Sequence, residues 1–175
     1  MKKIFIFILL TYISFSNGIN FVNRNNNFKL KKSLVVKEKI EIKKKKRFEK
    51  NKKKILILKK AKELMGKKYL WGAKVGDYNN FDCSSFVKAL YKEVGIDLPR
   101  VSKNQSKIGE KISLNELEIG DLIFFHTLGD YVSHVGIYIG NNEFIHASSK
   151  AKKTIVSKLS GYYREKAVFG TRLGI

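Results

Sequence analysis

Two segments in the middle of the chain place apolar residues at helical spacing. The first, ILILKKAKELMG, starts at Ile55 and ends at Gly66, a residue type that favours helix termination. The second predicts a helix over residues 83–94, with Asp82 as its N-cap and Gly95 after its last turn. The apolar faces consist of Leu58, Ala61, Leu64 and Met65 in the first helix and of Phe86, Val87, Leu90 and Tyr91 or Val94 in the second.

Beyond Pro99 the apolar residues alternate with polar ones, as they do in half-buried β-strands. Gly140-Asn141-Asn142 separates two of these segments and has the composition of a hairpin turn. Helices thus come first and an antiparallel sheet second, which predicts an α+β fold. The segments with this period are DLIFFH (121–126), HVGIYIG (134–140), EFIHAS (143–148) and KAVFGTRL (166–173).

The N-terminus has the three parts of a secretory signal peptide. Lys2 and Lys3 precede the apolar run IFIFILLTYISFS, in which Ser14 and Ser16 are small residues suited to cleavage. Residues 1–16 are therefore predicted to be a signal peptide that exports the protein. The run is shorter than the about 20 apolar residues of a spanning helix, but an uncleaved membrane anchor is the alternative.

Residues 17–54 are rich in asparagine and lysine and contain the runs KKKKR and KKK. Such a segment buries too little apolar surface to offset the entropy of ordering it, so we predict a basic, disordered leader. Its charge fits either a solvated tether or an arm that contacts anionic polymers of the cell envelope. Nucleic acid is not an expected partner, because an exported chain is carried away from it.

The overall composition leaves room for one folded domain, which is predicted at residues 55–175. The chain has 175 residues, of which 43% are apolar, so a core can form and a wholly disordered protein is excluded. The formal net charge of +21 is concentrated, because residues 28–60 hold 16 basic and 3 acidic residues whereas residues 61–175 hold 17 and 12. A single cysteine excludes a disulfide scaffold and a zinc site built from several thiolates.

That cysteine, Cys83, occupies the first turn of the second predicted helix. The positive end of the helix dipole and the free backbone N–H groups there favour a thiolate, which predicts a lowered pKa and a reactive nucleophile. A buried, inert cysteine is the alternative interpretation of the same position.

The three histidines, His126, His134 and His146, all lie in the strand-rich half. In a hairpin that turns at residues 140–142, His134 and His146 come close to opposite each other. They offer a base for the Cys83 thiol and a second polar group that fixes the tautomer of this base. The alternatives are histidines that serve only the sheet, or a metal site made of Cys83 and these two histidines. His126 is interpreted as a bystander or a subsite residue.

Six ordered motifs between Leu56 and Thr171 resemble the NlpC/P60 family of bacterial cell-wall cysteine peptidases, which have a papain-like fold. The resemblance implies an α+β domain in which N-terminal helices pack on a mainly antiparallel sheet. It also implies peptidoglycan as the partner, no metal and no organic cofactor. The motifs are GKKYLWGA, DCSSFV, LPRVSKNQ, GDLIFF, SHVGIYIG and EFIHASS.

The same resemblance implies a role for each member of the catalytic set. Cys83 matches the nucleophile, His134 the general base, and His146 the polar residue that orients the imidazole of the base. Two motif positions depart from the usual family pattern, because Ser85 and Ala73 stand where glycine is common. Both are small residues, so only the local shape of the subsite is affected unless a positive φ is required.

The resemblance also implies residues around the catalytic set. Tyr69 matches a tyrosine that helps to bind the oxyanion, while Asp82 and Ser84 match positions that shape the substrate subsite. Trp71 and Arg100 match motif positions too, and we interpret them as core packing and loop anchoring, respectively.

The implied function is an exported endopeptidase of the periplasm or cell wall that cuts the stem peptides of peptidoglycan. The implied bond joins D-γ-glutamate to the diamino acid that follows it. One alternative is an N-acetylmuramoyl-L-alanine amidase with the same Cys-His site. Another is a non-catalytic wall-binding protein whose basic leader does the binding.

Overall fold

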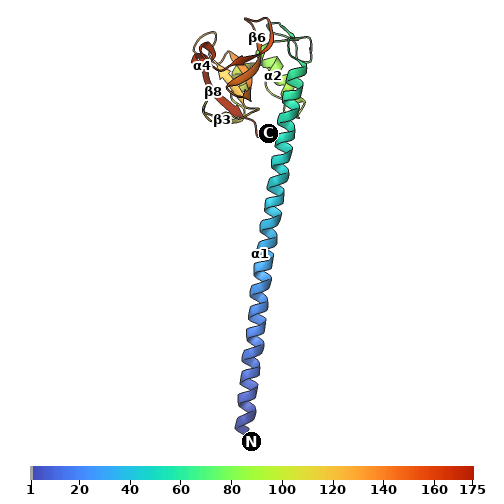
Figure 1. Cartoon of the computed structure of the whole chain (residues 1–175), viewed down its shortest axis with the longest axis vertical. Coiled ribbons are helices and arrows are strands. Elements are labelled where there is room, and N and C mark those ends of the chain that lie inside the picture. The colour runs from blue at the N-terminus through green and yellow to red at the C-terminus, as the bar shows by residue number, and fades with distance from the viewer. Residues whose placement is uncertain (1) are drawn as a thin grey trace. The chain divides into compact units, whose positions relative to one another are not determined.

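The computed structural model describes the backbone of residues 2–175 and the side chains of residues 29–175. The chain divides into two units, Met1–Arg47 and Phe48–Ile175. Helix α1 (Lys2–Glu63) comes first, and the other helices and all described strands lie in the second unit (Figure 1). Among the described residues, no helix combines the length and apolar character needed to cross a membrane. The signal peptide predicted for residues 1–16 lies outside the residues whose side chains are described.

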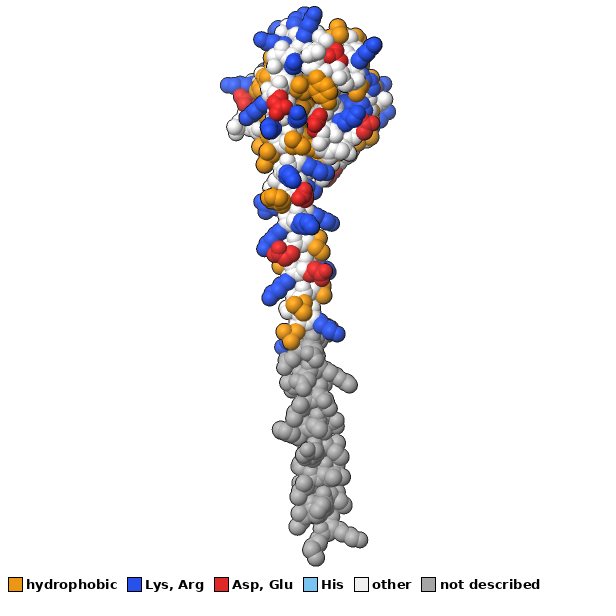
Figure 2. Space-filling model, turned by 90° about the vertical axis from the view of Figure 1, so that its right-hand side faces the viewer, with side chains coloured by type: hydrophobic (Ala, Val, Ile, Leu, Met, Phe, Trp, Pro, Cys, Tyr) orange, Lys and Arg blue, Asp and Glu red, His pale blue; other side chains and the backbone are white. Residues whose placement is uncertain are grey.

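The leader predicted to be disordered, residues 17–54, falls within helix α1. Its side chains from Lys29 to Lys53 are exposed. Figure 2 shows basic, acidic and apolar side chains interleaved along this part of the helix. The composition correctly indicates that these side chains bury little surface, but the backbone is helical because lysine, glutamate and leucine have high local helix propensity.

The last turns of α1 contribute to the core of the second unit. Gly66, whose φ is 76°, follows the helix, and its N–H donates to the Thr154 carbonyl (3.0 Å). The predicted stop is therefore correct, whereas Met65, 39% exposed, was assigned to the wrong face. The buried face consists of Ile57, Ala61 and Leu64.

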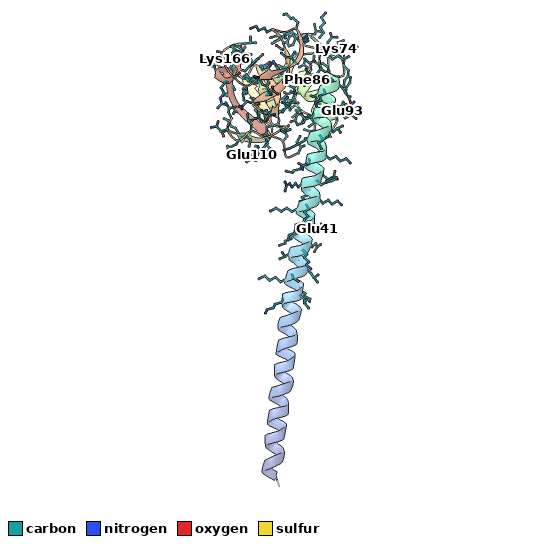
Figure 3. All side chains as sticks on the ribbon, viewed as in Figure 1. Glu41, Lys74, Phe86, Glu93, Glu110 and Lys166 are labelled. Atoms are coloured by element: carbon teal, nitrogen blue, oxygen red, sulfur yellow. The ribbon has the colours of Figure 1, made fainter. Side chains whose placement is uncertain are left out.

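Helix α2 (Cys83–Lys92) begins at the predicted residue. Its N-cap, Asp82, accepts a hydrogen bond from the Ser85 N–H (2.8 Å), and the Ser85 hydroxyl accepts one from the Asp82 N–H (3.0 Å). These reciprocal bonds form a capping box, which satisfies N–H groups that have no partner inside the helix. Figure 3 shows Phe86 of this helix in the interior and Glu93, just after it, at the periphery.

An eight-stranded sheet forms the second layer, in the order β2-β1-β7-β6-β5-β4-β8-β3. All described pairings are antiparallel except that of β1 with β2. The strands are β1 (Lys68–Tyr69), β2 (Asn80–Phe81), β3 (Glu110–Ile112), β4 (Leu122–Phe125), β5 (His134–Gly140), β6 (Glu143–Ser148), β7 (Lys153–Lys158) and β8 (Ala167–Arg172). Short helices α3 (Ser102–Gln105) and α4 (Tyr162–Lys166) complete the unit.

The sheet buries both of its faces. On one face, Phe124 and Ile137 pack in a cluster with Phe86 of α2. Alternate residues such as Phe125 and Phe144 point to the opposite face, into a smaller cluster. The predicted α+β architecture, with helices on a mainly antiparallel sheet, is confirmed.

The predicted strands agree closely with the sheet, and β5 and β6 coincide with their predicted ranges. Asn141 and Asn142 turn the hairpin with φ values of 53° and 55°, a conformation that asparagine tolerates in two-residue turns. Four strands, β1, β2, β3 and β7, were not predicted, and β7 contributes a residue to the candidate site.

Candidate active site

Cys83 is the first residue of α2 and is 6% exposed. The backbone N–H groups of Val135, in strand β5, and of Cys83 and Ser84 at the helix start are near enough to its sulfur to favour the thiolate and act to lower the pKa. Val135 directly follows His134. The sulfur thus lies against the first residues of the strand that carries the candidate base.

The pKa of Cys83 differs from the sequence prediction. Burial raises it to about 11, the negative charge of Asp82 raises it further, and the N–H groups of Val135, Ser84 and Cys83 lower it by less. The predicted thiolate was inferred from the helix N-terminus alone, and desolvation of the sulfur outweighs that effect. Cys83 is therefore a neutral thiol in the resting protein.

Tyr69 stands at the end of strand β1, partly buried against the main core cluster. Burial raises its pKa to about 12, and the nearby groups of Cys83 and Asp82 raise it in the same direction. Its phenol is therefore a neutral O–H donor in the neighbourhood of the thiol, which is the property that the predicted oxyanion role requires.

The two histidines of the hairpin are joined directly. His134 Nε2 and His146 Nδ1 are 2.7 Å apart, and the rings meet edge to face with centroids separated by 4.9 Å. Burial lowers the pKa of His134 to about 4. Burial and the neighbouring His134 lower that of His146 to about 2. Both rings are neutral at physiological pH, so His134 can act as a base.

The register of the strands differs slightly from the predicted one. Ile137 pairs with Ile145, which places Gly136 opposite His146 and leaves His134 on the diagonal. A bulge between Tyr138 and Gly140 interrupts the pairing beside the turn. Gly136 makes the diagonal contact possible, because a Cβ there would lie 2.6 Å from the Phe144 ring and 3.3 Å from His146 Cβ.

The hydrogen bonds of the two histidines continue into a third strand, through a residue that was not predicted from the sequence. His146 Nε2 is 3.0 Å from the hydroxyl of Ser157 in β7. Ile155 pairs with His146, so Ser157 also lies on the diagonal. A hydrogen-bonded series of His134, His146 and Ser157 therefore crosses β5, β6 and β7. The alternation of KTIVSK was the only signal for this strand.

Asp82 has a second function besides capping α2. Its carboxylate forms a two-pronged ion pair with the guanidinium of Arg100, which also donates to the Ser84 hydroxyl (3.0 Å) and the Ala73 carbonyl (2.7 Å). Burial acts to raise the pKa of Asp82, but the bonds from Arg100 and Ser85 outweigh it and the pKa lies below its usual value. Arg100 thus anchors the loops around Cys83, as predicted.

The two positions that depart from the family pattern are accommodated without strain. Neither Ser85 nor Ala73 has a positive φ. Ser85 is helical and completes the capping box, while Ala73 is buried and its carbonyl accepts from Arg100.

A pocket of about 390 Å³ opens beside Cys83. Trp71 stands at its rim and is 72% exposed, so the predicted role of this residue in core packing is wrong. Glycine at position 72 turns the chain outward there, with a φ of 71°. The lining residues are Trp71, Gly72, Asp82, Cys83, Ser84, Arg100, Val101, Ser102 and Ser133.

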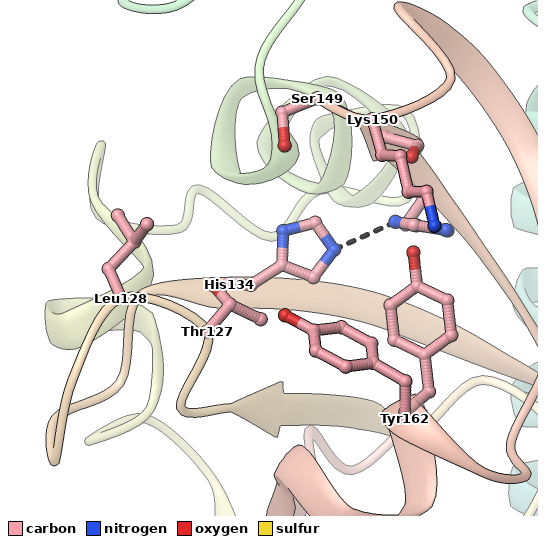
Figure 4. A pocket seen from close by; sticks show the side chains of 9 residues that line it. Thr127, Leu128, His134, Ser149, Lys150 and Tyr162 are labelled. Atoms are coloured by element: carbon pink, nitrogen blue, oxygen red, sulfur yellow. Dashed lines mark hydrogen bonds between the residues drawn. The ribbon is translucent and has the colours of Figure 1, made fainter.

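A second pocket, of about 500 Å³, opens beside the two imidazoles (Figure 4). Figure 4 shows Ser149 and Lys150 on one side of His134 and Tyr162 on the other. The lining residues are Thr127, Leu128, His134, His146, Ser148, Ser149, Lys150, Tyr162 and Tyr163. His134 lines this pocket and Cys83 lines the other.

Not all predicted site residues are in direct contact. Among the described side chains, no hydrogen bond joins the Cys83 thiol to an imidazole; such bonds often tighten only when substrate is bound. His126 lies outside the residues that line the two pockets, and its N–H donates to the Lys166 carbonyl (2.9 Å). Residues 29–175 contain no group of three or more His, Cys, Asp or Glu side chains placed to hold a metal ion.

Comparison with known proteins shows the family of the chain. Residues 66–173 match the sequence profile of the NlpC/P60 family, and this range includes Tyr69, Cys83 and both paired histidines. The chain belongs to the NlpC/P60 family.

Several relatives of this NlpC/P60 chain have names that state an activity. A protein of Haemophilus influenzae named "Probable endopeptidase NlpC homolog" is 41% identical over 102 residues, which are 58% of this chain and 52% of the relative. The Escherichia coli protein named "Murein DD-endopeptidase MepS/Murein LD-carboxypeptidase" is 41% identical over 86 residues, 49% of this chain and 45% of that one. The chain spans about half the length of these relatives or less.

A solved structure of a peptidoglycan hydrolase is also similar to this chain. The peptidoglycan hydrolase RipB of Mycobacterium tuberculosis superimposes with a TM-score of 0.61 at 30% identity, covering 70% of this chain and 65% of RipB. The names of the relatives therefore describe endopeptidases and peptidoglycan hydrolases.

Proposed function

We propose that the chain is an exported cysteine endopeptidase that cuts the stem peptides of peptidoglycan between D-γ-glutamate and the following diamino acid. The observation that carries the proposal is the position of Cys83 at the start of α2, against the N–H of the residue after His134. The names of the NlpC/P60 relatives support the reaction class.

In the proposed mechanism, Cys83 attacks as a neutral thiol. As the sulfur forms a bond to the amide carbon, His134 takes the thiol proton. The phenol of Tyr69 and the N–H of Cys83 donate to the oxyanion. The imidazolium of His134 then protonates the leaving amine, and the C–N bond breaks to give a thioester.

Water completes the cycle. His134, neutral again, takes a proton from water as the water oxygen attacks the thioester carbon. The C–S bond breaks, the sulfur recovers its proton from His134, and the acid product leaves. His146 positions His134 throughout, because its Nδ1 holds the Nε2 end of the ring. Asp82 and Ser84 shape the pocket that receives the acyl side of the substrate.

The bond assignment is tested by digestion of purified muropeptides, followed by mass spectrometry. A cut after D-γ-glutamate leaves a disaccharide dipeptide and releases a fragment that begins with the diamino acid. An amidase releases the whole stem peptide from the sugar, and a wall-binding protein gives no new mass. The name of the Escherichia coli relative makes a DD-endopeptidase the second candidate. Such an enzyme cuts the bond between two D-configured residues in a cross-link and would convert cross-linked muropeptide dimers into monomers.

The leader is proposed to hold the enzyme to anionic polymers of the envelope. Its support is the excess of basic residues in residues 28–60, which include 16 Lys and Arg. Binding of the chain to isolated cell walls should weaken as salt rises from about 50 to about 500 mM, since added salt shortens the screening length. A chain that begins at Asn51 keeps Ile57 in the core and should bind less while still cutting a soluble peptide. If binding of the full chain does not depend on salt, the leader does not bind these polymers by charge and acts only as a solvated tether.

A further inference from the structure

The pocket beside the imidazoles has an unusual charge. Among the residues that line it, Lys150 is the only one with a charged side chain at neutral pH, because no Asp or Glu lines the pocket and burial keeps His134 and His146 neutral. Lys150 forms no ion pair with any described residue. The pocket therefore presents one unpaired ammonium group.

The turn that carries Lys150 is well defined. Ser148 pairs with Lys153 across β6 and β7, so residues 149–152 form a tight connection. The Ala151 N–H donates to the Ser148 hydroxyl (3.1 Å), and Lys152 has a φ of 59°. This turn places the Lys150 stem beside the pocket, with Tyr162 across from it (Figure 4).

The direction of the proposed reaction decides which part of a substrate enters this pocket. The imidazolium of His134 must reach the leaving nitrogen to protonate it. The leaving residue consequently lies on the side lined by His134, and the acyl residue lies in the pocket lined by Cys83 and Asp82.

We propose that this pocket is a carboxylate-binding subsite, in which Lys150 selects substrates whose leaving residue is a diamino acid with a second carboxylate. The ammonium of Lys150 binds that carboxylate, and the hydroxyl groups of Tyr162 and Ser149 are additional donors. Leu128 and the tyrosine rings accommodate the methylene groups between the two ends of the residue. A diamino acid that lacks this carboxylate, such as lysine, brings only its terminal ammonium towards Lys150 and is repelled.

This inference rests on the proposed function, and its test separates the two. Two peptides are compared, L-Ala-γ-D-Glu-meso-diaminopimelate and L-Ala-γ-D-Glu-L-Lys, which differ in the carboxylate at the end of the leaving residue. The full chain should cut the first with kcat/KM about tenfold higher, mainly through a lower KM, as expected for one charge-assisted hydrogen bond. Lys150→Gln should reduce the ratio to about one, and Lys150→Glu should invert it.

Lys152→Gln is the matched control, because this lysine belongs to the same turn but does not line the pocket. It should keep the tenfold ratio. Equal cleavage of both peptides by the unmodified chain, or a ratio that survives Lys150→Gln, would overturn the inference.

A binding measurement keeps the two proposals distinguishable if neither peptide is cut. In the Cys83→Ala protein, titration calorimetry with the same peptides measures the subsite without any chemistry. If the diaminopimelate peptide binds more tightly and this preference disappears with Lys150→Gln, the subsite is supported. The absence of cleavage then contradicts only the proposed bond. Equal binding of the two peptides contradicts the subsite.

Discussion

His134 Nε2 lies 2.7 Å from His146 Nδ1, and this contact couples the tautomers of the two rings. For His134 to accept a proton from Cys83, its Nδ1 must be free, so its Nε2 carries hydrogen and donates to His146 Nδ1. His146 then carries its hydrogen on Nε2, which donates to the Ser157 hydroxyl 3.0 Å away. This set of tautomers satisfies both hydrogen bonds and leaves His134 Nδ1 free to accept the thiol proton.

The histidines should therefore differ in their contribution to the rate. His134→Ala should lower kcat by a factor on the order of 10² or more, because the general base is removed. His146→Ala should lower it less, since this ring only positions the base. His126→Ala is the control and should change the rate little. Steady-state kinetics on a soluble stem peptide measures all three, and the largest loss at His126 would identify a different base.

Ser157 should act as a positioning residue. Ser157→Ala removes the acceptor of the His146 N–H and should lower kcat by about three- to tenfold with little change in KM, because the ring that aligns His134 loses its anchor. Ser157→Thr keeps the hydroxyl in a β-strand and should restore the rate. Equal losses in the alanine and threonine variants would mean that the effect comes from packing.

The thiol should be slow to react in the resting protein. Because burial raises the pKa of Cys83 to about 11, iodoacetamide should label it at pH 7 at least about tenfold more slowly than a free thiol of pKa about 8.5. Labelling should accelerate as pH rises toward 11. The same cysteine in urea-unfolded protein is the control, since the chain has no other thiol. Faster labelling in the folded protein would indicate a thiolate-imidazolium pair at rest.

The raised pKa also links Cys83 to stability. The contribution of the Cys83 thiol to the free energy of unfolding is complete below its unfolded pKa of about 8.5, where the thiol is neutral in both states. It is lost as pH rises through the pKa of the folded protein. The histidines behave in the opposite sense, because their folded pKa values are lowered. Their contribution is complete above about pH 6.5 and is lost as pH falls toward the folded values.

Arg100 should stabilise the fold through Asp82. Arg100→Ala leaves a buried carboxylate without its main partner and should lower the free energy of unfolding by about 2–3 kcal/mol at pH 7. Arg164→Ala is the matched control, because this arginine makes one exposed hydrogen bond to Asn115 (3.2 Å), and should cost about 0.5 kcal/mol or less. Urea unfolding measures both. Similar losses would show that the ion pair adds nothing specific.

Much of the fold follows from local sequence signals. The hairpin between β5 and β6 was predicted because apolar alternation and an asparagine turn act within a few residues of each other. The N-cap at Asp82 was predicted for the same reason. Strand β7 was missed, because its lysines and short apolar stretch are stabilised as a strand only by pairing with β1 and β6.

The site could be predicted less completely, since its chemistry depends on burial. Cys83 and His134 lie in motifs that can be recognised in the sequence. The pKa of the thiol, in contrast, depends on how much solvent the fold removes from it. Trp71 shows the same limit, because nothing in its motif indicates that the chain turns this large ring outward. Ser157 joins the series only through a diagonal contact between strands, which a one-residue change of register would remove.

The most direct test of the central claim is the rate at which Cys83→Ala hydrolyses a muropeptide. Cys83 is predicted to be the nucleophile, so its loss should lower hydrolysis by a factor of about 10³ or more. The thermal unfolding midpoint should change by only a few degrees, because the substitution removes one small buried group from a helix start. Hydrolysis at the unmodified rate by a folded Cys83→Ala protein would contradict the account.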